Sequence, residues 1–153
     1  MANTFLQIHL HVVFTVKYRE ALIDSSFQDR LYKYIIAIFQ NHGHKVLAIG
    51  GVADHIHVLL GYDPREPLPS LMQQVKRDSS RWINEQGFLR QRFLWQEGYG
   101  AFAVCKRHLD VVVRYILNQE EHHRVQTLVE EYVEMLENEG LEFRPERIFS
   151  QPV

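Results

Sequence analysis

The sequence contains a single cysteine, Cys105, among its 153 residues. One cysteine cannot form an intrachain disulfide, and it excludes a zinc site built from several thiolates. No apolar run approaches the roughly 18 residues of a membrane span, and the first residues lack the basic and apolar segments of a signal peptide. A Gly-x-x-x-x-Gly-Lys phosphate loop is also missing, so no nucleotide cofactor is expected. We therefore expect a cytoplasmic protein that does not bind a membrane.

Charge is unevenly distributed along the chain. Residues 1–107 contain 13 Lys and Arg against 9 Asp and Glu, whereas residues 108–153 contain 4 against 10. The net charge of −2 is therefore the sum of a weakly basic body, residues 1–107, and an acidic tail, residues 108–153. Such a body can bind a short stretch of nucleic acid, but it argues against coating duplex DNA, which needs many phosphate contacts. The acidic tail taken alone is typical of a solvated helix.

The hydrophobic pattern predicts alternating strands and helices. We expect strands at residues 5–16, 45–52, 55–62 and 99–104, and helices at residues 27–41, around residues 71–82, at 108–123 and at 128–137. This order is β-α-β-β-α-β with helices appended. It predicts an α+β fold, a ferredoxin-like split β-α-β antiparallel sheet with helices on one face and extra C-terminal helices. The other sheet face must then be covered or functional.

The strand predicted at residues 55–62 carries two histidines, His55 and His57. Because side chains alternate across a strand, both imidazoles point to one face while the residue between them points into a core. Two neutral imidazoles held side by side supply half of a divalent-metal site. The spacing alone is weak support for a metal, since His9 and His11 repeat it and two half-exposed histidines would also produce it.

Tyr115 and Gln119 lie on a predicted helix about sixty residues further along the chain. Side chains four residues apart stack on one helix face. Packing alone also explains this tyrosine, because apolar neighbours supply a core stripe beside it. Gln119 is a modest metal ligand, and His122 and His123 extend the same side of the helix as alternatives to it.

Taken together, these motifs resemble those of the single-tyrosine HUH transposases, the small TnpA enzymes of hairpin-ended insertion sequences and their REP-associated relatives. The resemblance rests on His55 and His57, on Tyr115 with Gln119, on residues 11–19 and on residues 95–99, in the family's order. It covers roughly residues 5–123. It implies a catalytic domain at residues 1–123 that includes the tyrosine helix, with residues 124–153 an acidic helix and tail of the same domain.

The resemblance implies that Tyr115 is the catalytic nucleophile and that His55, His57 and Gln119 hold Mg²⁺ or Mn²⁺. It implies a homodimer that cleaves and rejoins single-stranded DNA beside a hairpin, through a 5′-phosphotyrosine link and a free 3′-hydroxyl. A phenol with an ordinary pKa of about 10 is a poor nucleophile at neutral pH. A metal ion on the scissile phosphate would stabilise the departing oxygen. Whether the tyrosine acts in its own subunit or in the partner is left open.

Basic and aromatic side chains on the predicted second helix and at strand ends are candidates for DNA contact. Those that end the first and fourth strands are expected to neighbour one another. A solvated charged surface explains each of these residues equally well. The predicted DNA-binding residues are Lys17, Tyr18, Arg19, Lys76, Arg77, Arg81, Lys106 and Arg107.

Two other functions stay open from the sequence. The same fold could recognise a DNA hairpin without cutting it, as a domesticated regulator, although such a binder has no need of the predicted nucleophile and ligands. A metal-dependent hydrolase of another class could use His55 and His57 with His9 or His11. Activity of that hydrolase would survive the loss of Tyr115.

Overall fold

A computed structural model of the chain describes residues 3–123 and 126–144. Four antiparallel strands form one sheet in the order β2-β3-β1-β4. The strands are β1 (His9–Thr15), β2 (Lys45–Val52), β3 (His55–Gly61) and β4 (Gly100–Ala103). This strand order, with a helix after β1 and another after β3, confirms the predicted α+β fold with its split β-α-β arrangement.

Five α-helices and two short 3₁₀ helices accompany the sheet in the part of the chain that the structure describes. They are η1 (Lys17–Arg19), α1 (Gln28–Asn41), α2 (Leu68–Gln86), η2 (Lys106–His108), α3 (Leu109–Leu117), α4 (Gln119–His122) and α5 (Leu128–Asn138). None of these described helices combines the length and hydrophobicity needed to cross a bilayer.

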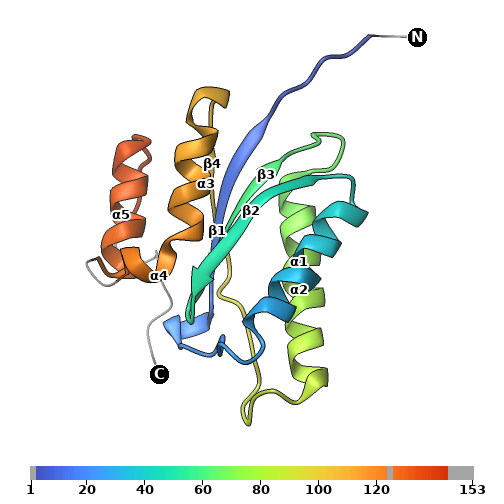
Figure 1. Cartoon of the computed structure of the whole chain (residues 1–153), viewed down its shortest axis with the longest axis vertical. Helices are drawn as coiled ribbons and strands as arrows, with labels where there is room; N and C mark the ends of the chain where they lie inside the picture. Colours follow the sequence, from blue (N-terminus) through green and yellow to red (C-terminus); the bar gives the residue numbers. More distant parts are fainter. Residues whose placement is uncertain (1–2, 124–125, 145–153) are drawn as a thin grey trace.

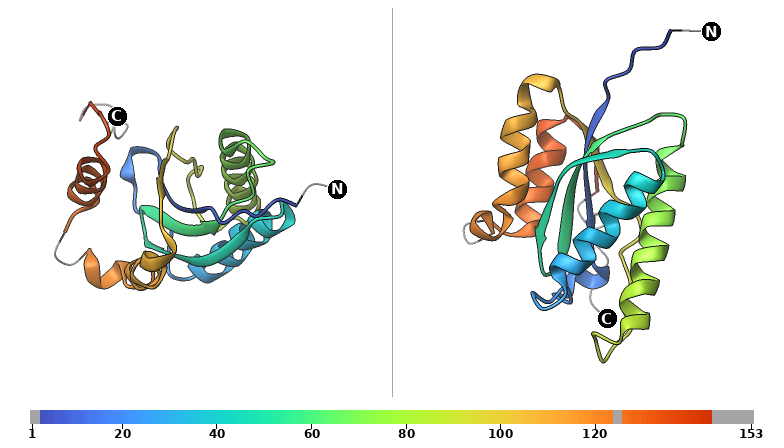
Figure 2. Two further views of the ribbon diagram at one scale, coloured as in Figure 1. Left: turned by 90° about the horizontal axis from the view of Figure 1, so that it is seen from above. Right: turned by 45° about the vertical axis from the view of Figure 1, so that its right-hand side comes forward.

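Helices cover the sheet on both sides (Figure 1). On one side α1 and α2 bury the main core, to which β3 contributes Ile56, Val58 and Leu60. On the other side α3 packs on β2 and β3, α4 contacts β2, and α5 lies beside α3 (Figure 2). The residues that alternate with the core positions of β3, including His55 and His57, therefore face the C-terminal helices. The sheet face that the sequence left unassigned is covered by these helices.

The backbone of helix α3 lies very close to the backbone of β2. A Cβ atom added to Gly50 would lie 2.3 Å from the carbonyl oxygen of Ile116. Only glycine permits this approach, because any side chain would push the helix off the sheet. The close contact places the turn of α3 that carries Tyr115 over Gly50 of β2, the residue that pairs with His57 of β3.

The first strand is shorter than predicted. It begins at His9 rather than at residue 5, because its register with β3 ends where His9 pairs with Gly61. Phe5 is 91% exposed and Leu6 60% exposed, so these apolar residues pack against no core in the described chain. Their β-branched and aromatic neighbours produced the longer prediction.

The helix predicted at residues 108–123 is also interrupted. Helix α3 ends at Leu117, and Asn118 (φ −102°, ψ 25°) separates it from α4. The prediction of one continuous helix was therefore wrong. The four-residue relation between Tyr115 and Gln119 nevertheless survives, since the Gln119 side-chain nitrogen donates to the Tyr115 carbonyl at 3.1 Å.

Candidate active site

The two histidines of β3 are held rigidly on the C-terminal helix side of the sheet. Both His55 and His57 are 0% exposed, so the half-exposed alternative does not apply. The Nδ1 of His55 lies 2.7 Å from the Asp54 carboxylate, and the Nδ1 of His57 lies 2.8 Å from Nε2 of His11. Because each Nδ1 has its own partner, each ring presents Nε2 to the space under α4 and α5. The predicted placement of both imidazoles on one sheet face is observed.

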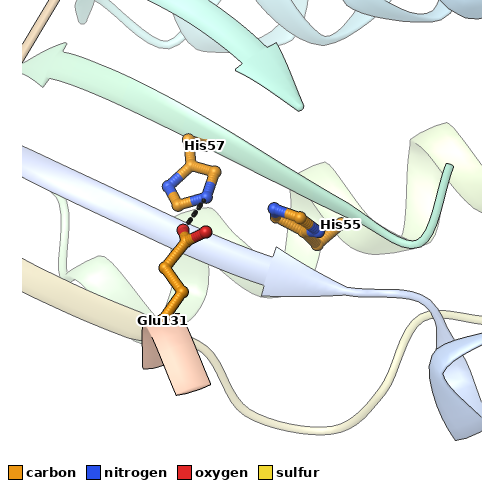
Figure 3. A group of neighbouring side chains, drawn as sticks. All are labelled: His55, His57 and Glu131. Carbon is orange, nitrogen blue, oxygen red and sulfur yellow. Dashed lines mark ion pairs between the residues drawn. The ribbon is translucent and has the colours of Figure 1, made fainter. Parts of the chain in front are cut away.

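A carboxylate that was not predicted from the sequence completes this group. Glu131 enters from α5, is 2% exposed, and places Oε1 2.7 Å from Nε2 of His57 (Figure 3). The ligand atoms of His55, His57 and Glu131 all lie within 4.8 Å of one another. Two imidazole nitrogens and a carboxylate oxygen form a donor set for a divalent ion. These residues therefore fit the kind of metal that the resemblance implies.

Helix packing explains why Glu131 reaches the site. Helix α5 begins with a capping box in which Thr127 and Glu130 exchange hydrogen bonds. Leu128 and Leu136 are buried on the same helix face, and Leu136 packs with Val13 and Phe102 of the sheet. The buried apolar positions of α5 thus turn Glu131 inward as well.

Glu131 is ionised among three histidines. Burial opposes ionisation of its carboxyl, but hydrogen bonds from His123 and His57 outweigh burial, so the pKa of Glu131 lies well below its ordinary range. His123 contacts Oε2 directly, and Nε2 of His122 lies 3.5 Å from the same oxygen. The histidines predicted as alternatives to Gln119 therefore lie against the carboxylate.

Tyr115 lies beside the histidines of its own chain. Its ring centroid is 5.6 Å from that of His57 and 6.0 Å from that of His11. Burial, and then the hydrogen bond to Glu131, raise the pKa of the Tyr115 hydroxyl well above its ordinary value. In this state the phenol is protonated. Tyr115 can thus lie next to the histidines of its own subunit without a partner subunit.

Gln119 borders the same space from α4. Its side chain is buried, with 1% of the residue exposed, and Oε1 lies 3.2 Å from Nε2 of His55. The structure therefore brings all four predicted nucleophile and ligand residues together, and adds Glu131 to them. Each of the two Nε2 atoms has one oxygen neighbour, an amide oxygen for His55 and a carboxylate oxygen for His57.

We expect acid to destabilise the metal-free protein. Burial lowers the pKa of His57 to about 4 and that of His11 to about 3, from an ordinary value of 6.5. Below pH 6.5 the unfolded chain binds these protons and the folded chain does not, so the free energy of unfolding should fall as the pH is lowered toward 4. Urea unfolding in EDTA over this range measures the fall. A His11→Gln variant should show a shallower slope, and a flat wild-type profile would contradict the stated burial effect.

The predicted DNA-binding residues fall at opposite ends of the sheet. The first group, Lys17, Tyr18 and Arg19, forms η1 just after β1. Lys106 and Arg107 are exposed on η2 after β4. Because β4 is antiparallel to β1 and pairs Ala103 with Leu10, its end lies near the start of β1. The expectation that these two groups neighbour one another was wrong.

The basic residues of α2 differ in their surroundings. Arg77 and Arg81 have side chains that are 62% exposed. The Lys76 ammonium instead lies 2.7 Å from the carbonyl oxygen of Gln96 and also contacts that of Gly98. Burial lowers the pKa of Lys76 to about 8. This lysine fastens the segment before β4 to α2, and its predicted contact with DNA stays a prediction.

The fold and this cluster define a class of protein, an α+β domain with a buried histidine pair facing a helix tyrosine. The family model described as "Transposase IS200 like" matches residues 4–119, and the chain belongs to this family. It is 25% identical over 118 residues to the ISDra2 transposase TnpA of Deinococcus radiodurans, covering 74% of this chain and 84% of that protein. It is 30% identical over 111 residues to the IS200 transposase of Salmonella typhimurium, covering 69% and 73%.

Solved structures share the fold. A crystal structure of a candidate transposase from Deinococcus radiodurans R1 matches with a TM-score of 0.64 and 23% identity, over 78% of this chain and 95% of that one. A REP-associated tyrosine transposase bound to a REP hairpin matches with a TM-score of 0.60 and 13% identity, over 80% and 73%. The family match ends at residue 119, so Glu131 lies outside it.

Proposed function

We propose that this transposase cleaves and rejoins single-stranded DNA at hairpin-bearing insertion-sequence ends, with Tyr115 as the nucleophile. The observation that carries the proposal is the position of the Tyr115 ring, 5.6 Å from that of His57, next to three ligand atoms within 4.8 Å of one another. The hairpin in the complex of the REP-associated relative supports a similar DNA substrate here.

The proposed reaction exchanges one phosphodiester for another. The Tyr115 oxygen attacks the phosphorus, the bond from phosphorus to the 3′-oxygen breaks, and the departing oxygen takes up a proton. The products are a 5′-phosphotyrosine and a free 3′-hydroxyl, and attack by a 3′-hydroxyl on the phosphotyrosine rejoins strands. No ATP is needed, because one ester bond replaces another. The phenolic proton passes to solvent as the bond to phosphorus forms, so one proton is released and one is taken up in each exchange.

His55 and His57 would hold the divalent ion, Mg²⁺ or Mn²⁺, together with an oxygen of Glu131 or Gln119. Such an ion would neutralise phosphate charge and stabilise the departing oxygen. The fixed Nδ1 partners, Asp54 and His11, keep both Nε2 atoms in place for it. Dimer formation and a cytoplasmic location also belong to this proposal.

A covalent-adduct assay tests the proposed function. The protein is incubated with Mn²⁺ and a labelled pool of DNA hairpins whose single-stranded flanks are randomised. We expect a labelled protein band that resists SDS, because the phosphotyrosine ester is covalent. EDTA should prevent the band from forming. Absence of an adduct across the whole pool would reject the proposed cleavage and favour the hairpin-binding alternative.

A further inference from the structure

We propose that a groove between α2 and the segment that follows it, residues 89–94, binds the phosphate backbone of single-stranded DNA. The groove would lead that strand to the Tyr115 site. This inference rests on the proposed function for its substrate. The groove is lined by four arginines, two from α2 and two from the following segment: Arg77, Arg81, Arg90 and Arg92. The latter two were not among the DNA-binding residues predicted from the sequence.

The arginines of the following segment are free to bind an anion. Arg90 and Arg92 are exposed, and the described part of the chain gives neither of them an ion pair. Arg81 has long contacts with its acidic neighbours, 3.6 Å to Asp78 and 3.9 Å to Glu85. Guanidinium groups bind phosphate oxygens through paired hydrogen bonds. The groove therefore offers more positive charge than its acidic neighbours neutralise.

The groove is preorganised. Asn84 of α2 bonds to both the nitrogen and the oxygen of Phe93, at 2.7 and 3.0 Å, and Phe93 is fully buried. This clamp fixes the backbone on which Arg92 lies. Leu94, which also lines the groove, is 40% exposed. An exposed apolar side chain beside arginines suits the unpaired bases of a single strand better than a duplex, whose bases are stacked inside.

Backbone hydrogen bonds connect the groove to the active site around the end of the sheet. The nitrogen of Lys17 donates to the carbonyl of Leu94 at 3.0 Å, and the nitrogen of Val16 donates to the carbonyl of Asp54 at 2.8 Å. Asp54 in turn holds His55. Both side views place η1 and the loop after α2 at the same end of the molecule as the turn between β2 and β3 (Figures 1 and 2).

The connecting turn is strained. Tyr18 and Arg19 in η1 have φ values of 60° and 56°. Residues other than glycine rarely have a positive φ. Two such residues in a row persist only where the surrounding structure enforces this backbone conformation, often at binding sites. The turn holds Lys17 and Tyr18 on the path between the groove and His55, where an ammonium and an aromatic ring can contact phosphate and base.

Fluorescence anisotropy tests the groove in a Tyr115→Phe background, in which binding is measured apart from cleavage. The probes are a labelled hairpin with single-stranded flanks, and the same hairpin without flanks. Arg90→Ala combined with Arg92→Ala should weaken binding of the flanked probe about tenfold per arginine. The slope of log affinity against log salt should become shallower by about 0.7 for each phosphate that the variant no longer binds. Binding of the flankless hairpin should change little.

The control removes the same charge elsewhere. Lys45→Ala combined with Arg65→Ala acts at the opposite end of the sheet, where Lys45 pairs with Gly61, and should leave the affinity for the flanked probe near that of the parent. Unchanged melting temperatures would show that all variants fold. The proposal is overturned if the groove variant binds the flanked probe like the parent, if the control weakens binding equally, or if the flankless hairpin loses as much affinity. If the groove variant binds the flanked probe more weakly but the wild type forms no adduct, the proposed cleavage is rejected and the proposed groove is retained.

Discussion

Replacing Tyr115 with phenylalanine is expected to abolish the SDS-resistant protein–DNA adduct while DNA binding survives. Loss of a covalent nucleophile removes the reaction path itself, so adduct formation should fall at least about a thousandfold. Phenylalanine retains the ring that packs 5.6 Å from His57 and 5.0 Å from His122. Only the hydroxyl is removed. Gel analysis of the labelled adduct and anisotropy on the same probe measure the two quantities.

A second tyrosine provides the matched control. Tyr132 follows Glu131 on α5, is partly buried, and packs in the small cluster formed by Val13, Phe102 and Leu136. Tyr132→Phe should therefore form the adduct at the wild-type level. If Tyr115→Phe still cut DNA, without any adduct, the metal-dependent hydrolase would explain the site better. If it still formed the adduct, another nucleophile would be at work.

The histidine pair and the tyrosine were predictable because they depend on local periodicity. Alternation along β3 is enforced by burial on both faces of a central strand, so His55 and His57 had to share a face. The pairing of Tyr115 with Gln119 depends on a single helical turn, and it tolerated the break at Asn118 because the side-chain amide still bonds across it.

Glu131 was not predictable in the same way. An acidic residue on an acidic amphipathic helix is normally solvated, so its sequence context favoured exposure. Its burial depends on how α5 docks on the sheet and on histidines brought from β3 and from the region after α4. The available signal was its position three residues after Leu128, on the helix face that Leu136 also occupies.

The surroundings of the basic residues were also not predictable from the sequence. Composition identifies Lys76 as a cation on a helix, but only the course of the chain around Gln96 and Gly98 determines that its ammonium is used internally. The direction of β4 decided the position of Lys106, since an antiparallel strand returns its end to the start of β1. Neither the internal contacts of Lys76 nor the position of Lys106 can be predicted from the type of residue alone.

Removing the Glu131 carboxylate is expected to weaken Mn²⁺ binding more than removing the Gln119 amide. Glu131→Gln keeps the side-chain shape and deletes a full negative charge 2.7 Å from Nε2 of His57, so Mn²⁺ affinity should fall about a hundredfold. Gln119→Ala deletes a neutral amide oxygen 3.2 Å from Nε2 of His55, and the expected loss is about tenfold. Titration calorimetry with Mn²⁺ alone measures both, independently of DNA cleavage.

A charge control separates coordination from long-range attraction. Glu137 is exposed on the same helix, and Glu137→Gln should bind Mn²⁺ like the wild type because solvent and salt screen its charge. His57→Ala should also weaken Mn²⁺ binding, since it deletes one of the two imidazole nitrogens of the site. If Gln119→Ala eliminated binding while Glu131→Gln left it intact, the ion would be held as the sequence resemblance implied. Glu131 would then occupy the site only in the metal-free state, and α5 would have to release that carboxylate from His57 before an ion could bind.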